Sequence, residues 1–388
     1  MHVPRMICSW FVVLGLGIAA DGRAADAAAP ADDAIRTLVR EWIADHDGVG
    51  LSVGVYDNGA RRFFNAGVPR LDANQPPSQD TVYEIGSITK AFTGQLLARA
   101  VVEGRAALDD DAAKYLAEPY PNLENGGERV RLVHLATMTS QLADNIPDLS
   151  QIRVKPGEPL AATRMKVIGA YTQRQFLAQL HRVAPRRPPG SEPENSNVAG
   201  MLLGVVLEKV YGAPFEELLV REIEKPLRMG SGVAPEPGRV ARGYTHAGEE
   251  LPPFEARMAH ASWGLRYSAD DLLRFAMWQL VERDASVKLA HRPGWYTPDG
   301  QRGVAFYWIV GDSPAGRRLF AAGGTYGFAS VCELYPDAKL ATVLLSNKAA
   351  DGAQESLRAL SAKIVEALRP DGLTSPSSWP AASRPAGR

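Results

Sequence analysis

The chain has 388 residues, of which 45% are hydrophobic and 22% are charged, and its formal net charge is −1. This length and composition are typical of a globular protein with one large or two interleaved domains. A charge near zero without a basic stripe excludes a surface built for nucleic acid, and the seven histidines show no metal-ligand spacing. We therefore expect neither a nucleic-acid partner, nor a metal, nor a cofactor.

The N-terminus has the three parts that are typical of a signal peptide. Arg5 supplies a positive charge, residues 7–20 form an apolar run that is short for a membrane span, and small residues around Ala24 suit cleavage. We predict that residues 1–24 are a signal peptide and that the protein is periplasmic or secreted. The mature chain would keep only Cys332, which excludes an intramolecular disulfide.

The first part of the mature chain predicts a helix followed by a β-hairpin. Residues 31–46 place their apolar side chains on one helical face. Residues 48–57 alternate apolar and small side chains and end in the turn pair Asn58-Gly59, so residues 61–66 are expected to return as the second strand.

The middle of the chain is loop-rich and mostly helical, and the last third returns to strands. Helices are predicted at 87–103, 173–182, 197–211, 214–223 and 268–282, with a Pro/Arg/Gly-rich loop at 184–190. Strands are predicted at 303–311, 317–322, 327–335 and 340–346, followed by a helix at 349–368 and a disordered tail at 369–388. The first and last helices are expected to cover one face of a shared antiparallel sheet.

The segment with the clearest chemistry is Ser87-Ile88-Thr89-Lys90, at the start of the helix predicted over residues 87–103. Residues three apart lie on one face of a helical turn, so the Ser87 hydroxyl and the Lys90 amine are neighbours. A desolvated lysine has a lowered pKa and accepts the serine proton, which makes the serine oxygen a nucleophile. The helix N-terminus adds donors for an oxyanion. A bare S-x-x-K is expected roughly once by chance in a chain of this length, so the assignment depends on other segments.

Those other segments follow in a fixed order. They are residues 133–140 (VHLATMTS), Pro189-Gly190 before residues 195–197 (NSN), residues 263–265 (WGL), residues 321–328 (AAGGTYGF) and residues 345–347 (LSN). Together with S-x-x-K, they resemble the serine β-lactamase/penicillin-binding-protein superfamily, and most of all its class C β-lactamases and their peptidase and esterase relatives. The resemblance covers about residues 31–368.

The resemblance implies an α/β (α+β) fold, in which helices flank an antiparallel sheet. Residues 25–368 would form the domain, with the sheet built from about 31–86 and 290–368 and a mostly helical part from about 87–289.

By the same resemblance, Ser87 is the nucleophile and Lys90 its base. The backbone N–H groups of Ser87 and Gly324 would form the oxyanion hole. The residues expected to contact the substrate are Asn195, Asn197, Gly323 and Thr325.

Two positions depart from the family pattern. Asn195 stands where the family has a tyrosine that transfers protons, and Ala321 stands where the family has a lysine or histidine. An amide has no titratable proton at neutral pH, and alanine carries no charge.

Three groups are candidates for the lost proton transfer. Lys90 acts alone in the first alternative, as in Ser-Lys dyads. In the others, Tyr326 reaches in from the strand edge, or Glu192 or Glu194 supplies a carboxylate.

The resemblance thus implies an exported serine hydrolase that forms an acyl-Ser87 intermediate. Its partner would be a small-molecule or cell-wall-derived substrate, either an ester, an amide or a cell-wall-type compound. Poor β-lactamase activity is expected, because Ala321 cannot hold the substrate carboxylate.

Two alternatives stay open. The first is a catalytically degenerate binding protein of the same fold, since a fold does not by itself guarantee its function. The second is a hydrolase, carbohydrate-active enzymes included, that uses carboxylates such as Glu192 and Glu194. The sequence does not fix the oligomeric state.

Overall fold

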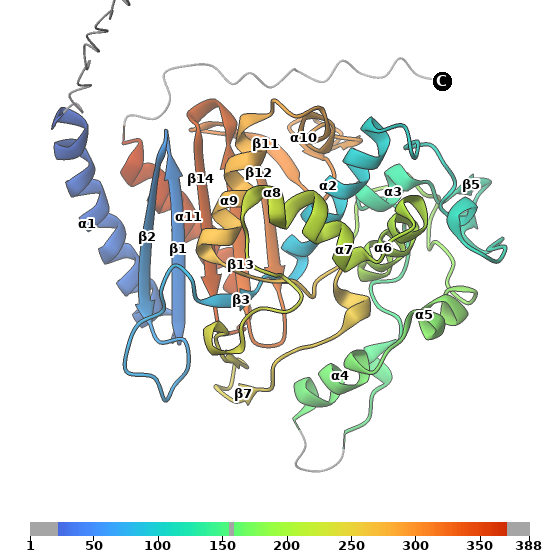
Figure 1. The fold of residues 1–388 in the computed structure, drawn as a ribbon, viewed down its shortest axis with the longest axis horizontal. Coiled ribbons are helices and arrows are strands. Elements are labelled where there is room, and N and C mark those ends of the chain that lie inside the picture. The colour runs from blue at the N-terminus through green and yellow to red at the C-terminus, as the bar shows by residue number, and fades with distance from the viewer. Residues whose placement is uncertain (1–21, 155–158, 371–388) are drawn as a thin grey trace, which may run out of the picture.

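The structure is a computed structural model that describes residues 22–154 and 159–370. Nearly all of the predicted signal peptide lies outside these residues, and so does the predicted tail from residue 371 onward. An eight-stranded antiparallel sheet forms the centre, in the order β2-β1-β14-β13-β12-β11-β10-β9 (Figure 1). Its strands are β1 (Gly50–Asp57), β2 (Ala60–Gly67), β9 (Trp295–Tyr296), β10 (Arg302–Val304), β11 (Ile309–Ser313), β12 (Gly316–Gly324), β13 (Ala329–Tyr335) and β14 (Leu340–Ser346).

The predicted hairpin forms as β1 and β2, with Asn58 and Gly59 in its turn. Both turn residues have positive φ, 44° and 106°, which matches the twist of a tight hairpin. The strands at the two ends of the chain then meet, because β1 pairs with β14 along its whole length.

Helices cover both faces of the sheet, and each face has its own apolar core. On one face, α1 (Gly22–Asp45) and α11 (Ala353–Leu368) pack together against strands that include β1 and β14. On the other face, α9 (Ala269–Val281) and α2 (Thr89–Val102) pack against the sheet (Figure 1). Successive strand residues point to opposite faces, so β14 contributes to both cores. The prediction that the first and last helices share one face is confirmed.

The remaining helices of the described residues lie beside the sheet or against the helices that cover it (Figure 1). They are α3 (Leu132–Ala136), α4 (Leu160–Gly169), α5 (Gln173–Leu180), α6 (Asn197–Tyr211), α7 (Phe215–Leu219), α8 (Lys225–Leu227) and α10 (Ala285–Ala290). Six short strands of the described residues lie outside the main sheet and form three pairs: β3 (Val82–Glu84) pairs with β8 (Arg266–Ser268), β4 (Glu124–Asn125) with β5 (Glu128–Arg129), and β6 (Gly243–Tyr244) with β7 (Glu250–Leu251). Within the described ranges no single helix is both long and apolar enough to cross a membrane, and α6 meets that test only as a bent pair with the helices that follow it.

Two predicted elements were wrong in detail. The single strand expected at 303–311 is two strands, β10 and β11, joined by a turn in which Tyr307 has a φ of 61°. The turn buries Phe306 and Trp308, so its apolar residues look like strand residues in the sequence. The helix expected from residue 87 begins at Thr89, because Gly86–Ile88 forms a separate 3₁₀ turn.

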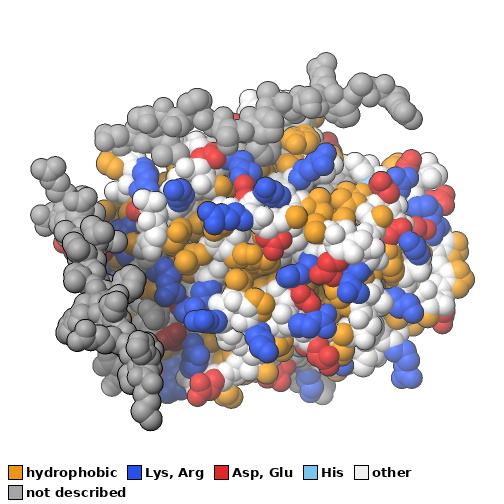
Figure 2. Space-filling view, turned by 45° about the horizontal axis from the view of Figure 1, so that its top comes forward, with side chains coloured by type: hydrophobic (Ala, Val, Ile, Leu, Met, Phe, Trp, Pro, Cys, Tyr) orange, Lys and Arg blue, Asp and Glu red, His pale blue; other side chains and the backbone are white. Residues whose placement is uncertain are grey.

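Acidic and basic side chains lie close together across the face drawn in Figure 2, with apolar groups between them. This mixture agrees with the small net charge of the whole chain.

Candidate active site

Ser87 lies in the 3₁₀ turn Gly86–Ile88, between β3 and α2, where the chain passes the end of β12. Two glycines allow this close approach. Gly86 has a φ of 51°, and a Cβ added to it would lie 2.5 Å from the backbone nitrogen of Gly324. A Cβ added to Gly323 would lie 2.0 Å from the Ile85 carbonyl oxygen and 2.9 Å from the Ser87 nitrogen. The backbones that carry Ser87 and Gly324 are therefore in direct contact.

A buried hydroxyl ties this turn to the next strand. Ser330 on β13 donates its Oγ–H to the carbonyl oxygen of Ile85 at 2.8 Å, and it faces Gly323 across the β12–β13 ladder. The bond fixes the residue two positions before Ser87 to the sheet. The nucleophile's backbone is thus held by packing and hydrogen bonds rather than by a flexible loop.

Lys90 lies one helical turn after Ser87 and is 2% exposed. Its Nζ is 2.9 Å from Ser87 Oγ and 2.7 Å from Asn197 Oδ1. Burial lowers the pKa of Lys90 to about 7, although the Asp144 carboxylate opposes that shift. A lysine with this pKa is neutral in a substantial fraction near pH 7, and a neutral amine accepts a proton from the serine.

Asn197 opens α6, which carries it to the Ser87–Lys90 pair. Ser196 caps the helix by accepting the Ala199 N–H at 3.0 Å, and it donates its own Oγ–H to the carbonyl oxygen of Ala143 at 2.8 Å. Ser262 donates to the Asn197 carbonyl oxygen at 3.1 Å. The helix start is therefore fixed against the loop that follows α3.

Asn195, at the position of the family's tyrosine, is exposed and donates its Nδ2–H to Asp144 Oδ1 at 2.7 Å. Ala321, at the position of the family's cation, lies on β12 opposite Cys332 and is buried in the core on the α2 side of the sheet. Neither side chain brings a titratable group to Ser87.

Thr325 and Tyr326 follow the end of β12. The Thr325 hydroxyl hydrogen-bonds the buried carboxyl of Glu84, whose pKa burial raises to about 7. Tyr326 packs edge-on against Trp263, with ring centroids 6.4 Å apart, and burial raises the pKa of its phenol. A raised pKa disfavours the phenolate, so Tyr326 is better suited to forming a wall than to accepting a proton.

Glu192 and Glu194 are engaged elsewhere. Glu194 forms ion pairs with both Arg186 and Arg187, at 2.6 Å for the Arg186 pair, and Glu192 lies 3.7 Å from Arg187. These contacts gather the two carboxylates into a cluster with arginines on the loop before α6.

Two residues that the sequence did not single out take part in the site. Asn145 accepts the Asn197 Nδ2–H at 3.0 Å on its Oδ1 and donates its own Nδ2–H to Asp144 Oδ2 at 2.6 Å. Both residues lie in the loop after α3, just beyond the VHLATMTS segment. Asp144 and Asn145 belong to no motif of the family pattern. The one signal in the sequence that could have indicated them is their position a few residues after the VHLATMTS segment.

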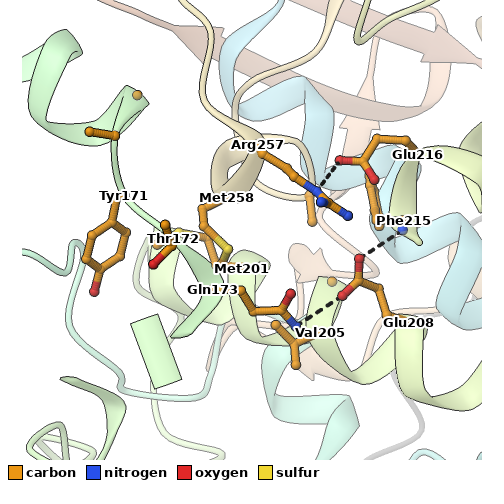
Figure 3. Close-up of a pocket in the computed structure, with 14 residues that line it drawn as sticks. Tyr171, Thr172, Gln173, Met201, Val205, Glu208, Phe215, Glu216, Arg257 and Met258 are labelled. Atoms are coloured by element: carbon orange, nitrogen blue, oxygen red, sulfur yellow. Dashed lines mark hydrogen bonds and ion pairs between the residues drawn. The ribbon is translucent and has the colours of Figure 1, made fainter. Parts of the chain in front are cut away.

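A separate cavity of about 280 Å³ lies where the start of α5 meets α6 and α7 (Figure 3). Its charged groups are occupied: Glu208 accepts from Gln173 Nε2 and from the Phe215 N–H, both at 3.1 Å, and Arg257 pairs with Glu216 at 3.2 Å. The cavity is lined by residues other than Ser87, Lys90 and Asn197. Within the described residues, no group of three or more His, Cys, Asp or Glu side chains is arranged to hold a metal ion.

Known proteins resemble this chain over most of its length. The family model described as Beta-lactamase matches residues 33–366. A beta-lactamase of Pseudomonas fluorescens is 27% identical over 277 residues, which is 69% of this chain and 71% of that protein. The D-alanyl-D-alanine-carboxypeptidase/endopeptidase AmpH of Escherichia coli (strain K12) is 29% identical over 237 residues, 61% of this chain and 58% of its own length. The solved beta-lactamase/D-alanine carboxypeptidase of Pseudomonas syringae is similar with a TM-score of 0.70 and 22% identity, over 87% of this chain and 98% of that one.

The protein is a serine hydrolase with an antiparallel sheet flanked by helices, as predicted, and its fold is that of class C β-lactamases, one of which is similar with a TM-score of 0.73 and 20% identity over 87% of this chain. The chain belongs to the beta-lactamase family, because the family model spans most of its length. The resemblance to the serine β-lactamase/penicillin-binding-protein superfamily is confirmed.

Proposed function

We propose that this protein is an acyl-transfer hydrolase in which Ser87 is the nucleophile and Lys90 its general base. The observation that carries the proposal is the buried Lys90 amine, which lies 2.9 Å from Ser87 Oγ and has a pKa lowered to about 7. Proximity, burial and a titration point near neutrality are the properties that a serine needs from its base.

The proposed reaction has two halves. The Ser87 O–H bond breaks, its proton passes to Lys90 Nζ, and Oγ bonds to the substrate carbonyl carbon. The carbonyl oxygen becomes an oxyanion, to which the N–H groups of Ser87 and Gly324 donate. The intermediate collapses, the leaving group takes the proton from Lys90, and an acyl-Ser87 ester remains. In the second half, water gives a proton to Lys90 and its oxygen bonds to the ester carbon. The bond from that carbon to Ser87 Oγ then breaks, Oγ takes the proton back from Lys90, and the acid leaves.

The proposed substrate is an ester, an amide or another acyl donor of small-molecule or cell-wall type. Two of the curated relatives are named a beta-lactamase and a D-alanyl-D-alanine-carboxypeptidase/endopeptidase, and both names denote enzymes that hydrolyse an amide bond. The buried Ala321 replaces the cation that the resemblance assigns to binding a substrate carboxylate. Substrates without that carboxylate are therefore favoured, and β-lactam hydrolysis is expected to be slow.

We also propose export to the periplasm or the medium, since Arg5, the apolar run 7–20 and Ala24 have the order of a signal peptide. N-terminal sequencing of protein from the native host tests this. Recovery of Met1 in a cytosolic fraction would contradict it.

Labelling with a fluorophosphonate, which traps an activated serine, tests the proposed function. The expected result is a single adduct on Ser87 in mass spectrometry, lost in Ser87→Ala. A folded wild-type protein that takes up no label would instead indicate a binding protein of the same fold. An adduct on another residue would contradict the assignment of Ser87.

A further inference from the structure

Lys90 is one end of a chain of hydrogen bonds that leads away from Ser87. Lys90 Nζ donates to Asn197 Oδ1 at 2.7 Å, Asn197 Nδ2 donates to Asn145 Oδ1 at 3.0 Å, and Asn145 Nδ2 donates to Asp144 Oδ2 at 2.6 Å. The chain therefore begins at an amine and ends at a carboxylate.

The two ends fix the direction of every bond between them. An ionised carboxylate only accepts hydrogen bonds, so Asn145 must present its NH₂ group to Asp144 and its carbonyl to Asn197. Asn197 must then present its NH₂ group to Asn145 and its carbonyl to Lys90. Lys90 donates to that carbonyl whether it is charged or neutral, and the lone pair of a neutral amine remains for Ser87. Aligned bonds of this kind also strengthen one another.

Asp144 also holds Asn195, one of the two changed motif positions. Its Oδ1 accepts the Asn195 Nδ2–H at 2.7 Å, so Asn195 does not supply a proton donor or acceptor directly to Lys90. The backbone of Asp144 has a separate task, because its carbonyl oxygen accepts the N–H groups of Asn197 at 2.8 Å and of Val198 at 3.3 Å. The backbone of Asp144 therefore holds the start of α6 independently of its side chain, whose two oxygens accept hydrogen bonds from Asn195 and Asn145.

We propose that Asp144 is a positioning residue that stabilises the Lys90 ammonium that forms when Ser87 gives up its proton. This inference rests on the proposed function of Ser87 and Lys90. The arrangement parallels a Ser-His-Asp triad, in which the acid orients the base and stabilises its protonated form without taking the proton. Here two asparagine amides connect the acid to the base.

The charges around Lys90 make Asp144 the group to test. Lys90 hydrogen-bonds the neutral side chains of Ser87 and Asn197, and Ser262 donates to Asn197 from behind. Asp144 is the charged group that acts on Lys90, and it raises the pKa of the amine against the effect of burial. Near Asn195, the negative charge of Glu194 is balanced by its ion pairs with Arg186 and Arg187.

The experiment measures the rate of Ser87 acylation by a fluorophosphonate as a function of pH. The wild-type rate is expected to rise with pH as Lys90 loses its proton, with a midpoint near 7. In Asp144→Asn the charge that favours the ammonium is gone, so the midpoint is expected to move to lower pH. An opposite charge within about 4–6 Å shifts a pKa by about 1–3 units, and Asp144 acts from farther away, so we expect a shift of roughly one unit or less. The plateau rate is expected to fall by roughly tenfold, because the ammonium loses its counter-charge.

Three further variants separate this role from a structural one. Asp144→Glu is expected to restore the wild-type midpoint, at least in part, because it restores the charge. Asp148→Asn removes a carboxylate from the same loop, where Asp148 caps a 3₁₀ turn by accepting the Ser150 N–H at 2.9 Å, and it is expected to leave the midpoint unchanged. If Asp144→Asn does not fold, Asn145→Ala breaks the amide chain in its place and is expected to lower the midpoint as well.

The outcomes distinguish the two proposals. A wild-type protein that is not acylated at any pH overturns the proposed function. A wild-type protein that is acylated, together with an Asp144→Asn midpoint identical to the wild-type midpoint, overturns the role of Asp144 and leaves Ser87 and Lys90 standing.

Discussion

The two walls of the site are built in different ways. The wall formed by the Gly86–Ile88 turn and β12 is made of backbone, and its fit depends on the absence of side chains at Gly86 and Gly323. The wall formed by the start of α6 and the loop after α3 is made of polar side chains, which include Asn197, Asn145 and Asp144.

The two changed motif positions lie in different walls. Asn195 belongs to the side-chain wall, where it is hydrogen-bonded to Asp144. Ala321 lies on β12, but the family's lysine or histidine at this position acts through its side chain and not through its backbone. Gly86 and Gly323 tolerate no added Cβ, because the backbones around them are in direct contact, whereas a side-chain wall tolerates exchange as long as its donors and acceptors remain satisfied. This difference explains how the site keeps its nucleophile geometry while two motif residues change.

The largest effect is expected from Lys90→Met, which removes the base from the side-chain wall and keeps the volume of the buried side chain. Loss of a general base costs about 10²–10⁴-fold in rate, so fluorophosphonate acylation of Ser87 is expected to fall by that factor. Lys209→Met, an exposed change on α6, is the matched control and is expected to leave the rate unchanged. Equal rates in the two variants would mean that Ser87 is activated by some other group.

The next largest effect is expected from Gly323→Ala, which tests the backbone wall. The new Cβ would lie 2.0 Å from the Ile85 carbonyl oxygen, so the Ser87 turn must move away from β12. A misplacement of about 1 Å can cost roughly 10²-fold in rate, and a loss of that size is expected in acylation. Gly311→Ala on β11, whose added Cβ comes no closer than 3.3 Å to a neighbour, controls for glycine loss in the same sheet. Unchanged acylation in Gly323→Ala would show that the backbone wall is more pliable than its packing implies.

The difference between the walls also explains which features could be predicted from the sequence. Helix and strand periodicity, and turn residues such as Asn58-Gly59, depend on neighbours in the chain, and so the hairpin and α6 were predicted well. Ser87 and Lys90 are three residues apart, so one helical turn brings them together. Asp144, Asn145 and Asn197 are more than 50 residues away from Lys90 in the sequence, and their hydrogen bonds depend on how the loop after α3 folds onto α6. The prediction of a single strand over residues 303–311 was wrong for the same reason, because tertiary packing decides the shape of the buried turn at Phe306.

The next prediction reverses the two departures. Wild-type turnover of nitrocefin is expected to lie below the usual enzyme range of about 10⁴–10⁸ M⁻¹s⁻¹ in kcat/KM, because Ala321 offers no cation. A charge-assisted hydrogen bond contributes about 1.5–3 kcal/mol, so the double change Asn195→Tyr plus Ala321→Lys is expected to raise β-lactam acylation by roughly tenfold or more. Both groups act in one transition state, so the gain is expected to exceed the sum of the two single changes. A folded double variant with no gain would mean that these positions do not face Ser87.

The smallest effect is expected from Asn195→Ala alone, and this variant gives the sharpest test of the side-chain wall. Asn195 is exposed, and its one hydrogen bond to Asp144 runs to a carboxylate that water can solvate in its place. A typical hydrogen bond contributes about 0.5–1.5 kcal/mol net, and because water can replace this exposed one we expect a cost at the lower end, about 0.5–1 kcal/mol, or a loss of roughly fivefold or less in acylation rate. The amide chain from Lys90 through Asn197 and Asn145 to Asp144 is untouched by this change, so the midpoint of the pH profile is expected to stay near 7. The measurement is again fluorophosphonate acylation against pH, with thermal unfolding as the check on folding. A loss of a hundredfold or a displaced midpoint would show that Asn195 itself takes part in the proton transfer, and the side-chain wall would then depend on its motif residue as strictly as the backbone wall depends on its glycines.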